Sequence, residues 1–565
     1  MMSLSKNLRS ARSFVHYYLL IFLFGPYSAH AGEQALLGHW KLSSNANDSS
    51  GNENHGKNHD VIFGIAGPDR KPNSAARFNG RNAYIEVPSN KTLQLATNDF
   101  TLTVWAHTDH ALDDVIGDLV SKFDPAARRG LNWCIKNGHG MTGSQANYRN
   151  VHFGIDAETE PKWTDCGRPG NAVYIMAMAV HDGNLFVGTC EGGQNDTGHV
   201  YRYGGRTNWI DCGSPDESNA VTALAVHDGK LYAGTGRYRL RGSALVDSLN
   251  TNPGGKVLRY EGDGQWIDCG QVEKIDAVGG LGVFRGQLFA TSMYNYPAFF
   301  RYAGDKQWLP GPLPANGRLI TALSPYNGFL YAASWGGCDI YRIDGQKWSD
   351  AVNLESNGQT YSLEVHAGGL YTGTWRNGRV YRTNDGLSWA STGRLDEEQE
   401  VMGMAVHNGK LYAGTLPLAQ VFRFDDEQGW TNTGRLDHTP DVRYRRAWSM
   451  AVFQGRLFCG TLPSGHVHAL AAGCSVTHDE ELKPGWRNLA AVRKGDRLQL
   501  FVDGDQVAES MPIEGSAFDL ANDKPLLIGF GGHDFFQGSM SDLRLYGRAL
   551  TPEEISSQSV QASRD

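Results

Sequence analysis

Apolar and polar positions alternate through the middle of the chain in one recurring unit. In two clear copies, residues 219–236 and 401–416, an apolar run leads to an Asp-Gly or Asn-Gly pair, and an alternating run follows. Such pairs favour two-residue hairpin turns because they tolerate the positive φ that these turns need. A third run, such as 256–260 or 379–382, comes next, and then a turn and a run containing Trp. The pattern predicts four short strands per unit.

The unit occurs seven times, and a Trp and a turn Gly mark each copy. The Trp-to-Gly spacing is 20 residues in six copies and 25 in the last, with Trp at 163, 209, 266, 308, 348, 389 and 430 and Gly at 183, 229, 286, 328, 368, 409 and 455. Seven such units predict a seven-bladed β-propeller. The Trp run 162–166 precedes the first hairpin and the seventh unit lacks one, so we expect 162–166 to complete blade seven and remove the open edges.

The segments that flank the repeats carry motifs of one fold family. Residues 36–157 contain LLGHWKL, AARFNGRNAYIEV and FTLTVWAH, and residues 485–557 contain GWRNLAAVRKGDRLQLFVDGDQV and GSMSDLRLYGRALTPEEI. Together they resemble the laminin-G-like, concanavalin A-like lectin/glucanase jelly roll. In that family a strand like 151–156 is soon followed by a segment like 486–492, but here more than 300 residues intervene.

The resemblance therefore implies an all-β chain in which the propeller is inserted into one loop of the jelly-roll sandwich. Such an insertion requires the two ends of the insert to lie close together. The predicted parts are a signal peptide, the N-terminal part of the jelly roll, the propeller, the C-terminal part of the jelly roll and a tail, at 1–31, 32–157, 158–474, 475–557 and 558–565.

The first 31 residues have the pattern of an export signal. Lys6, Arg9 and Arg12 precede an apolar run at 14–24, and a small-x-small site ends at Ala31. The run is short for a bilayer span. We expect cleavage after Ala31, a secreted or periplasmic location, and no membrane span in the mature chain.

Charge and cysteine content narrow the classes of partner and cofactor. The net charge is −8 without an extended basic run, which argues against a nucleic-acid partner. Export permits disulfides among the eight cysteines, with 105 possible pairings. Cys166, Cys212 and Cys269 occupy equivalent repeat positions, so we expect them not to pair with one another. No Cys/His spacing is typical of zinc.

One face of the propeller is the candidate binding surface. The loops after the second strand and after the Trp strand vary in length, with insertions at 235–257 and 434–448. Aromatic faces suit sugar C–H groups, and Arg suits carboxylate or sulfate. The candidate ligand-binding residues on this face are Trp335, Trp375, Tyr238, Arg237, Tyr294 and Arg376. The alternatives are that Trp335 and Trp375 plug the channel and that the arginines lie on a solvated loop.

A structural calcium site is implied by the resemblance. Asp48 and Asp542 match family positions that often hold Ca²⁺, a cation that prefers several oxygen ligands. Asp48 is equally suited to forming a turn. No organic cofactor is expected.

The leading hypothesis for function is a secreted, non-catalytic protein that binds a polysaccharide, with an acidic one favoured. No segment matches the paired-Glu strand of related glucanases; Asp156-AETE is nearest and does not fit. The alternatives are a propeller-type polysaccharide lyase or glycoside hydrolase and a protein-binding scaffold. For an enzyme the candidates are Glu191, Tyr238, Arg237 and His438, without assigned roles.

Overall fold

The computed structural model describes residues 35–138, 143–193, 195–355, 358–513 and 518–564. The predicted signal peptide lies outside them. The described residues are nearly all strands, turns and loops, with one α-helix, α2 (Pro552–Arg564), and short 3-10 helices η1 (Lys91–Leu93), η2 (Leu240–Ser243) and η3 (Asp426–Gln428). None of the described helices is long and apolar enough to cross a membrane. The chain is all-β, as predicted.

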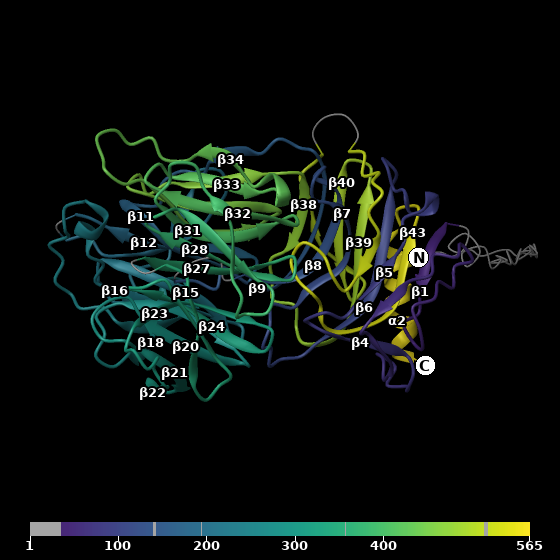
Figure 1. The fold of residues 1–565 in the computed structure, drawn as a ribbon, viewed down its shortest axis with the longest axis horizontal. Coiled ribbons are helices and arrows are strands. Elements are labelled where there is room, and N and C mark those ends of the chain that lie inside the picture. The colour runs from purple at the N-terminus through teal and green to yellow at the C-terminus, as the bar shows by residue number, and fades with distance from the viewer. Residues whose placement is uncertain (1–34, 139–142, 194, 356–357, 514–517, 565) are drawn as a thin grey trace, which may run out of the picture.

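Two β-sheets form the sandwich on the right of Figure 1. Sheet A has the order β3-β4-β43-β6-β39-β40-β41, with β1 paired to β43, and sheet B the order β2-β5-β42-β7-β8-β9-β38. Sheet A contains β1 (Leu36–Trp40), β3 (Ile62–Ile65), β4 (Ala75–Asn79), β6 (Phe100–Thr108), β39 (Gly485–Lys494), β40 (Arg497–Val502), β41 (Asp505–Glu509) and β43 (Gln537–Tyr546). Sheet B contains β2 (Lys57–His59), β5 (Tyr84–Val87), β7 (Gly117–Asp124), β8 (Arg129–Gly138), β9 (Asn147–Ala157), β38 (Cys474–His478) and β42 (Leu526–Ile528).

The two flanking pieces of the chain share both sheets. In sheet A, β39 pairs with β6, with Gly485 opposite Thr108. In sheet B, β38 pairs with β9, with Cys474 opposite Ile155. Apolar side chains of both sheets then pack into one core. The residues between β9 and β38 build the propeller, so the predicted architecture, a propeller inserted into one loop of a sandwich, is confirmed.

The propeller has seven four-stranded antiparallel blades, on the left of Figure 1. Blade 1 is β11 (Ala172–His181), β12 (Asn184–Glu191), β13 (Val200–Tyr203) and β14 (Trp209–Asp211); blade 2 is β15 (Ala220–His227), β16 (Lys230–Gly236), β17 (Lys256–Gly262) and β18 (Gln265–Gln271). Blade 3 is β19 (Val278–Phe284), β20 (Gln287–Ser292), β21 (Phe299–Gly304) and β22 (Gln307–Pro310); blade 4 is β23 (Leu319–Tyr326), β24 (Phe329–Trp335), β25 (Asp339–Ile343) and β26 (Trp348–Asn353). Blade 5 is β27 (Gln359–His366), β28 (Gly369–Trp375), β29 (Arg379–Thr383) and β30 (Ala390–Arg394); blade 6 is β31 (Glu400–His407), β32 (Lys410–Leu416), β33 (Gln420–Phe424) and β34 (Trp430–Arg435). Blade 7 is β35 (Arg446–Phe453), β36 (Arg456–Leu462), β37 (Val467–Ala471) and β10 (Lys162–Asp165).

Blade 7 closes the ring with a strand from the start of the insert. β10 pairs with β37, with Lys162 opposite Ala471 and Asp165 opposite His468. The same pairing places the two ends of the insert side by side, as the insertion requires.

The recurring Trp joins neighbouring blades. In blade 2, Trp266 donates its Nε1–H to the carbonyl oxygen of Cys212, at the end of blade 1, at 2.8 Å. Trp308 of blade 3 bonds the Cys269 carbonyl in the same way at 2.9 Å. The corresponding bonds at the other blades run from Trp163, Trp209, Trp348 and Trp430. Trp389 differs, because its buried Nε1 has no hydrogen-bond partner among the described residues.

The hairpin turns between the first and second strands of the blades face the sandwich. Backbone bonds seat several of them on it: the amide nitrogens of Gly183, Arg285, Gly328 and Ala367 donate to the carbonyl oxygens of Asp479, Leu112, Asp113 and Gly532. A buried ion pair between Lys410 of blade 6 and Asp156 of β9 adds to the same interface. Residues 143–147, at the entry to β9, reach further into the ring. The Ala146 carbonyl accepts from Val180 of blade 1, and the Asn147 side chain bonds Val452 of blade 7. These residues lie across the lower mouth of the propeller, the mouth nearest the sandwich.

The state of the cysteines differs from the expectation that disulfides form among them. All eight are buried free thiols, so no disulfide forms among them. Cys166, Cys212 and Cys269 each end a Trp strand in a different blade, and their sulfurs lie near the carbonyl oxygens of Thr164, Ile210 and Ile267. Packing in separate blades keeps these thiols apart.

The inter-blade bond predicts a stability difference between two tryptophans. Trp266→Phe should lower the free energy of unfolding by about 1 kcal/mol more than Trp389→Phe, because only the first loses a hydrogen bond. Both variants lose the same indole volume, so Trp389→Phe is the matched control. Urea unfolding followed by fluorescence measures both, and equal losses would contradict the prediction.

Candidate functional site

Six aromatic side chains form a closed circuit around the upper mouth of the propeller, the mouth that faces away from the sandwich. We call them the aromatic annulus. Each comes from a different blade, and each ring contacts the next, with centroid distances between 5.5 and 6.3 Å. In order around the mouth they are Tyr174, Tyr238, Tyr294, Trp335, Tyr361 and Trp448.

Arg446 lies within the annulus as a buried cation with incomplete pairing. Its guanidinium is 6.0 Å from the Tyr174 ring centroid and 5.8 Å from that of Trp448. Its Nη2 is 4.0 Å from Glu400 of blade 6, a long ion pair. Its Nε is buried and has no hydrogen-bond partner within the described ranges. The guanidinium is therefore a buried cation whose donors are only partly paired.

The two insertions seen in the sequence meet at this arginine. The first contributes Tyr238 and Ser243, whose hydroxyl oxygens accept from Arg446 Nη1 at 3.1 and 2.9 Å. The second runs up to Arg446 itself, which begins β35. Variable loops of a rigid scaffold thus supply the charged centre of the mouth.

Burial sets the electrostatics of the annulus. Desolvation raises the pKa of the Tyr174, Tyr294 and Tyr361 hydroxyls well above their usual range. Burial also raises the pKa of Glu400, although Arg446 opposes this. The tyrosines are therefore neutral hydrogen-bonding groups near pH 7, and the mouth carries positive charge from Arg446.

The structure brings most of the predicted ligand-binding residues to this mouth. Tyr238, Tyr294 and Trp335 belong to the annulus, and Trp375 packs beside it. Arg376 stacks on Trp375, with its guanidinium 4.6 Å from the ring centroid.

Arg237 is an exposed neighbour of the annulus, on the loop that follows β16. Arg239, two residues further, stacks on Tyr294 at 4.5 Å and pairs with Asp276 at 3.1 Å. Two blades, 2 and 5, thus each place an arginine over an aromatic ring at the rim of the mouth.

Sequence reasoning missed the annulus members on the innermost strands. Tyr361 and Trp448 stand seven residues before the turn glycine, where other copies have Thr222 or Met402. A bulky ring at that position in only some copies is the signal that would have identified them. Arg446 and Glu400 carry no such signal, because they come together only when the innermost strands of blades 6 and 7 pack side by side.

The other sequence candidates lie apart from the annulus. Glu191 is buried, and its carboxylate accepts from the Tyr201 hydroxyl at 3.3 Å. His438 is exposed on the blade 7 insertion.

Asp48 and Asp542 lie on either side of His39. The His39 backbone donates to Asp48 Oδ1 at 2.8 Å, and its Nε2 lies 2.6 Å from Asp542 Oδ1. Ser50 also donates to Asp48, and Arg544 pairs with Asp542 at 2.8 Å. The two carboxylates are thus neighbours, each with protein donors. Calcium binding there stays a prediction.

The outer face of sheet B is covered by the propeller. Side chains of β8 and β9 alternate, so Trp133 and Phe153 enter the sandwich core while Cys134, His152 and Asp156 point the other way. These outward residues are at most 1% exposed.

Four rings of the annulus, Tyr174, Tyr238, Tyr361 and Trp448, are buried as well. The accessible part of the upper mouth is its rim, where Tyr294, Trp335 and Trp375 are half-buried and Arg237, Arg239 and Arg376 are exposed.

Comparison with known proteins gives one family match and several propeller structures of low similarity. Residues 449–556 match the profile of the concanavalin A-like lectin/glucanases superfamily. No curated protein matches the chain significantly.

The propeller is similar to solved propeller structures. A streptogramin B lyase is 10% identical, with a TM-score of 0.45 over 55% of this chain and 98% of that one. A virginiamycin B lyase from Staphylococcus aureus is 11% identical, with a TM-score of 0.44 over 55% and 99%. The WD40 propeller domain of Doa1 is 11% identical, with a TM-score of 0.38 over 55% and 97%. Likeness at this level concerns the fold alone. The chain thus combines a concanavalin A-like, laminin-G-like domain with a β-propeller.

Proposed function

We propose that this protein binds an acidic polysaccharide at the upper mouth of its propeller without cleaving it, and that it does so after export. The observation that carries the proposal is the aromatic annulus with arginines stacked on its rim. Aromatic faces pack against the C–H faces of sugars, and guanidinium groups bind carboxylate or sulfate with paired donors.

The rim arginines are held in position for such a ligand. The guanidinium groups of Arg239 and Arg376 lie over the rings of Tyr294 and Trp375, which restricts their side chains before a ligand arrives. Arg446 adds a third positive charge deeper in the mouth. A polysaccharide with repeated anionic groups would contact several of these charges at once.

The electrostatics favour binding over proton abstraction. A lyase needs a base near its substrate's acidic proton. The tyrosines Tyr174, Tyr294 and Tyr361 have raised pKa values, so they hold their protons at neutral pH. Tyr294, which is half-buried, suits the role of a hydrogen-bond donor to a glycan. Tyr174 is buried, and the Tyr361 hydroxyl already donates to Gln359 Oε1. A lyase or hydrolase remains the alternative, distinguished by the appearance of cleaved products.

Retention on immobilised polysaccharides tests the site. Trp335→Ala and Arg376→Ala should each weaken retention on sulfated or uronic polymers by about tenfold or more. A hydrogen bond to a charged group contributes about 1.5–3 kcal/mol, where about 1.4 kcal/mol is tenfold, and the Trp335 variant loses the ring face that packs on the sugar. Arg301→Ala, on the outer part of blade 3, is the matched control and should leave retention unchanged.

The same assay separates the alternatives. Unchanged retention in both mouth variants would remove the annulus from the binding site. New reducing ends or unsaturated products, formed by the parent protein and lost in Tyr238→Phe, would establish an enzyme instead.

The raised pKa of Glu400 predicts a pH dependence. As pH falls through this pKa, Glu400 gains a proton and no longer neutralises Arg446, while a sulfate ester stays anionic. Binding of a sulfated polysaccharide should therefore tighten severalfold on acidification. Glu400→Gln should bind tightly at all pH values and lose this dependence. Titration by calorimetry between pH 4 and 8 measures it; a parent protein whose affinity falls on acidification would contradict it.

A further inference from the structure

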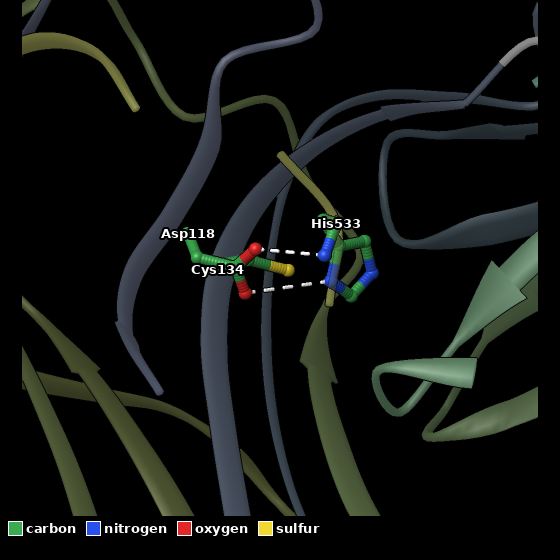
Figure 2. Close-up of side chains that lie close together, drawn as sticks. All are labelled: Asp118, Cys134 and His533. Carbon is green, nitrogen blue, oxygen red and sulfur yellow. Dashed lines mark hydrogen bonds and ion pairs between the residues drawn. The ribbon is translucent and has the colours of Figure 1, made fainter. Parts of the chain in front are cut away.

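Three metal-ligating side chains converge on the covered face of sheet B. Asp118 of β7, Cys134 of β8 and His533 of the loop between β42 and β43 each place a ligand atom within 4.8 Å of the others. Figure 2 shows the Asp118 carboxylate and the Cys134 sulfur directed toward the His533 ring. Asp118 and Cys134 are at most 1% exposed and His533 is 6% exposed.

Backbone pairing fixes this arrangement. Asp118 and Cys134 stand directly opposite each other in the β7–β8 register. Asp118 Oδ2 accepts from the amide nitrogens of His533 and Asp534 at 2.7 and 3.0 Å, which holds the loop against the sheet. The second oxygen, Oδ1, stays available and lies 3.5 Å from His533 Nδ1.

The cluster leaves polar atoms unsatisfied. Asp118 Oδ1 and both ring nitrogens of His533 are buried without a hydrogen-bond partner in the described part of the chain. Leaving such groups unpaired in a protein interior costs free energy, and most buried polar atoms have partners. A bound group that accepts electron pairs would take one from Asp118 Oδ1, one from a ring nitrogen of His533 and one from Cys134 Sγ. The other ring nitrogen of His533 would stay unpaired.

We propose that Asp118, Cys134 and His533 bind a divalent transition-metal ion of the zinc type. Two ligands at about 2.0–2.1 Å from a tetrahedral zinc lie roughly 3.3 Å apart, close to the Oδ1–Nδ1 separation here. Thiolate and imidazole ligands favour zinc over Ca²⁺ or Mg²⁺, which take oxygen ligands. The Cys134 thiol proton passes to solvent when the metal binds.

The metal would stabilise the interface between the sandwich and blade 5 of the propeller. Gly532, next to His533, accepts from the Ala367 amide of blade 5 at 3.2 Å and lies 2.6 Å from His366 Nδ1. Fixing the His533 loop therefore fixes the platform on which blade 5 sits. The site is independent of the polysaccharide proposal and is separate from Asp48 and Asp542.

Metal loading of the full chain tests the proposal. The chelator-treated protein should take up about one Zn²⁺ per chain and melt at a higher temperature once loaded. Loaded with Co²⁺ instead, it should show thiolate-to-cobalt charge-transfer absorption. Absence of stoichiometric uptake, or an unchanged melting temperature, would overturn the proposal, and neither measurement needs a variant.

Two cysteine variants then locate the site. Cys134→Ser should lose the charge-transfer band. Its affinity for zinc should fall by more than roughly 10- to 100-fold, which is the loss expected when a residue that only hydrogen-bonds to a metal ligand is removed. Cys459→Ser, which removes another fully buried thiol in blade 7, is the matched control and should keep the band. His533→Gln should weaken zinc binding while the thiolate band of any residual complex persists. A band that survives in Cys134→Ser, or disappears in Cys459→Ser, would contradict the assignment.

Discussion

The main-chain pairing of β10 with β37 is the constraint on which the rest of the structure depends. It closes the ring of blades and gives blade 7 the same four strands as the other six. It also brings the start and the end of the insert together, so that β9 and β38, only a few residues away, can pair in sheet B. A sandwich and a propeller can share one chain in this way because the pairing of β10 with β37 both completes the propeller and brings together the two chain segments that enter the sandwich.

The two faces of the propeller have different surroundings: one packs on the sandwich and the other carries the long loops. The hairpin turns are short and uniform because they must seat on sheet B, where Lys410 and Asp156 and several backbone bonds join the two domains. The opposite loops have no such requirement and have lengthened at two places. Those two loops meet at Arg446, so variation in length and concentration of charge occur at the same mouth.

The sequence predicts what depends on local periodicity. Seven blades could be predicted from the repeated hairpins and the Trp spacing. Closure of the ring could be predicted from the Trp strand 162–166, which precedes the first hairpin, and the split sandwich from the flanking motifs. Side-chain contacts between blades could not be predicted: Arg446 and Glu400 stand 46 positions apart, and their approach depends on how the innermost strands of blades 6 and 7 pack. The cluster of Asp118, Cys134 and His533 shows no sequence spacing typical of a metal site, because strand pairing and a distant loop assemble it.

The position of β6 has a consequence for biosynthesis. This strand lies in the middle of sheet A, and both of its neighbours, β39 and β43, are translated after the whole propeller. The nascent N-terminal segment therefore waits with two vacant strand edges while more than 300 residues are made. Long-range pairing of this kind is slow and leaves aggregation-prone edges in the interval. The growing chain would benefit from a holding chaperone until its last strands arrive.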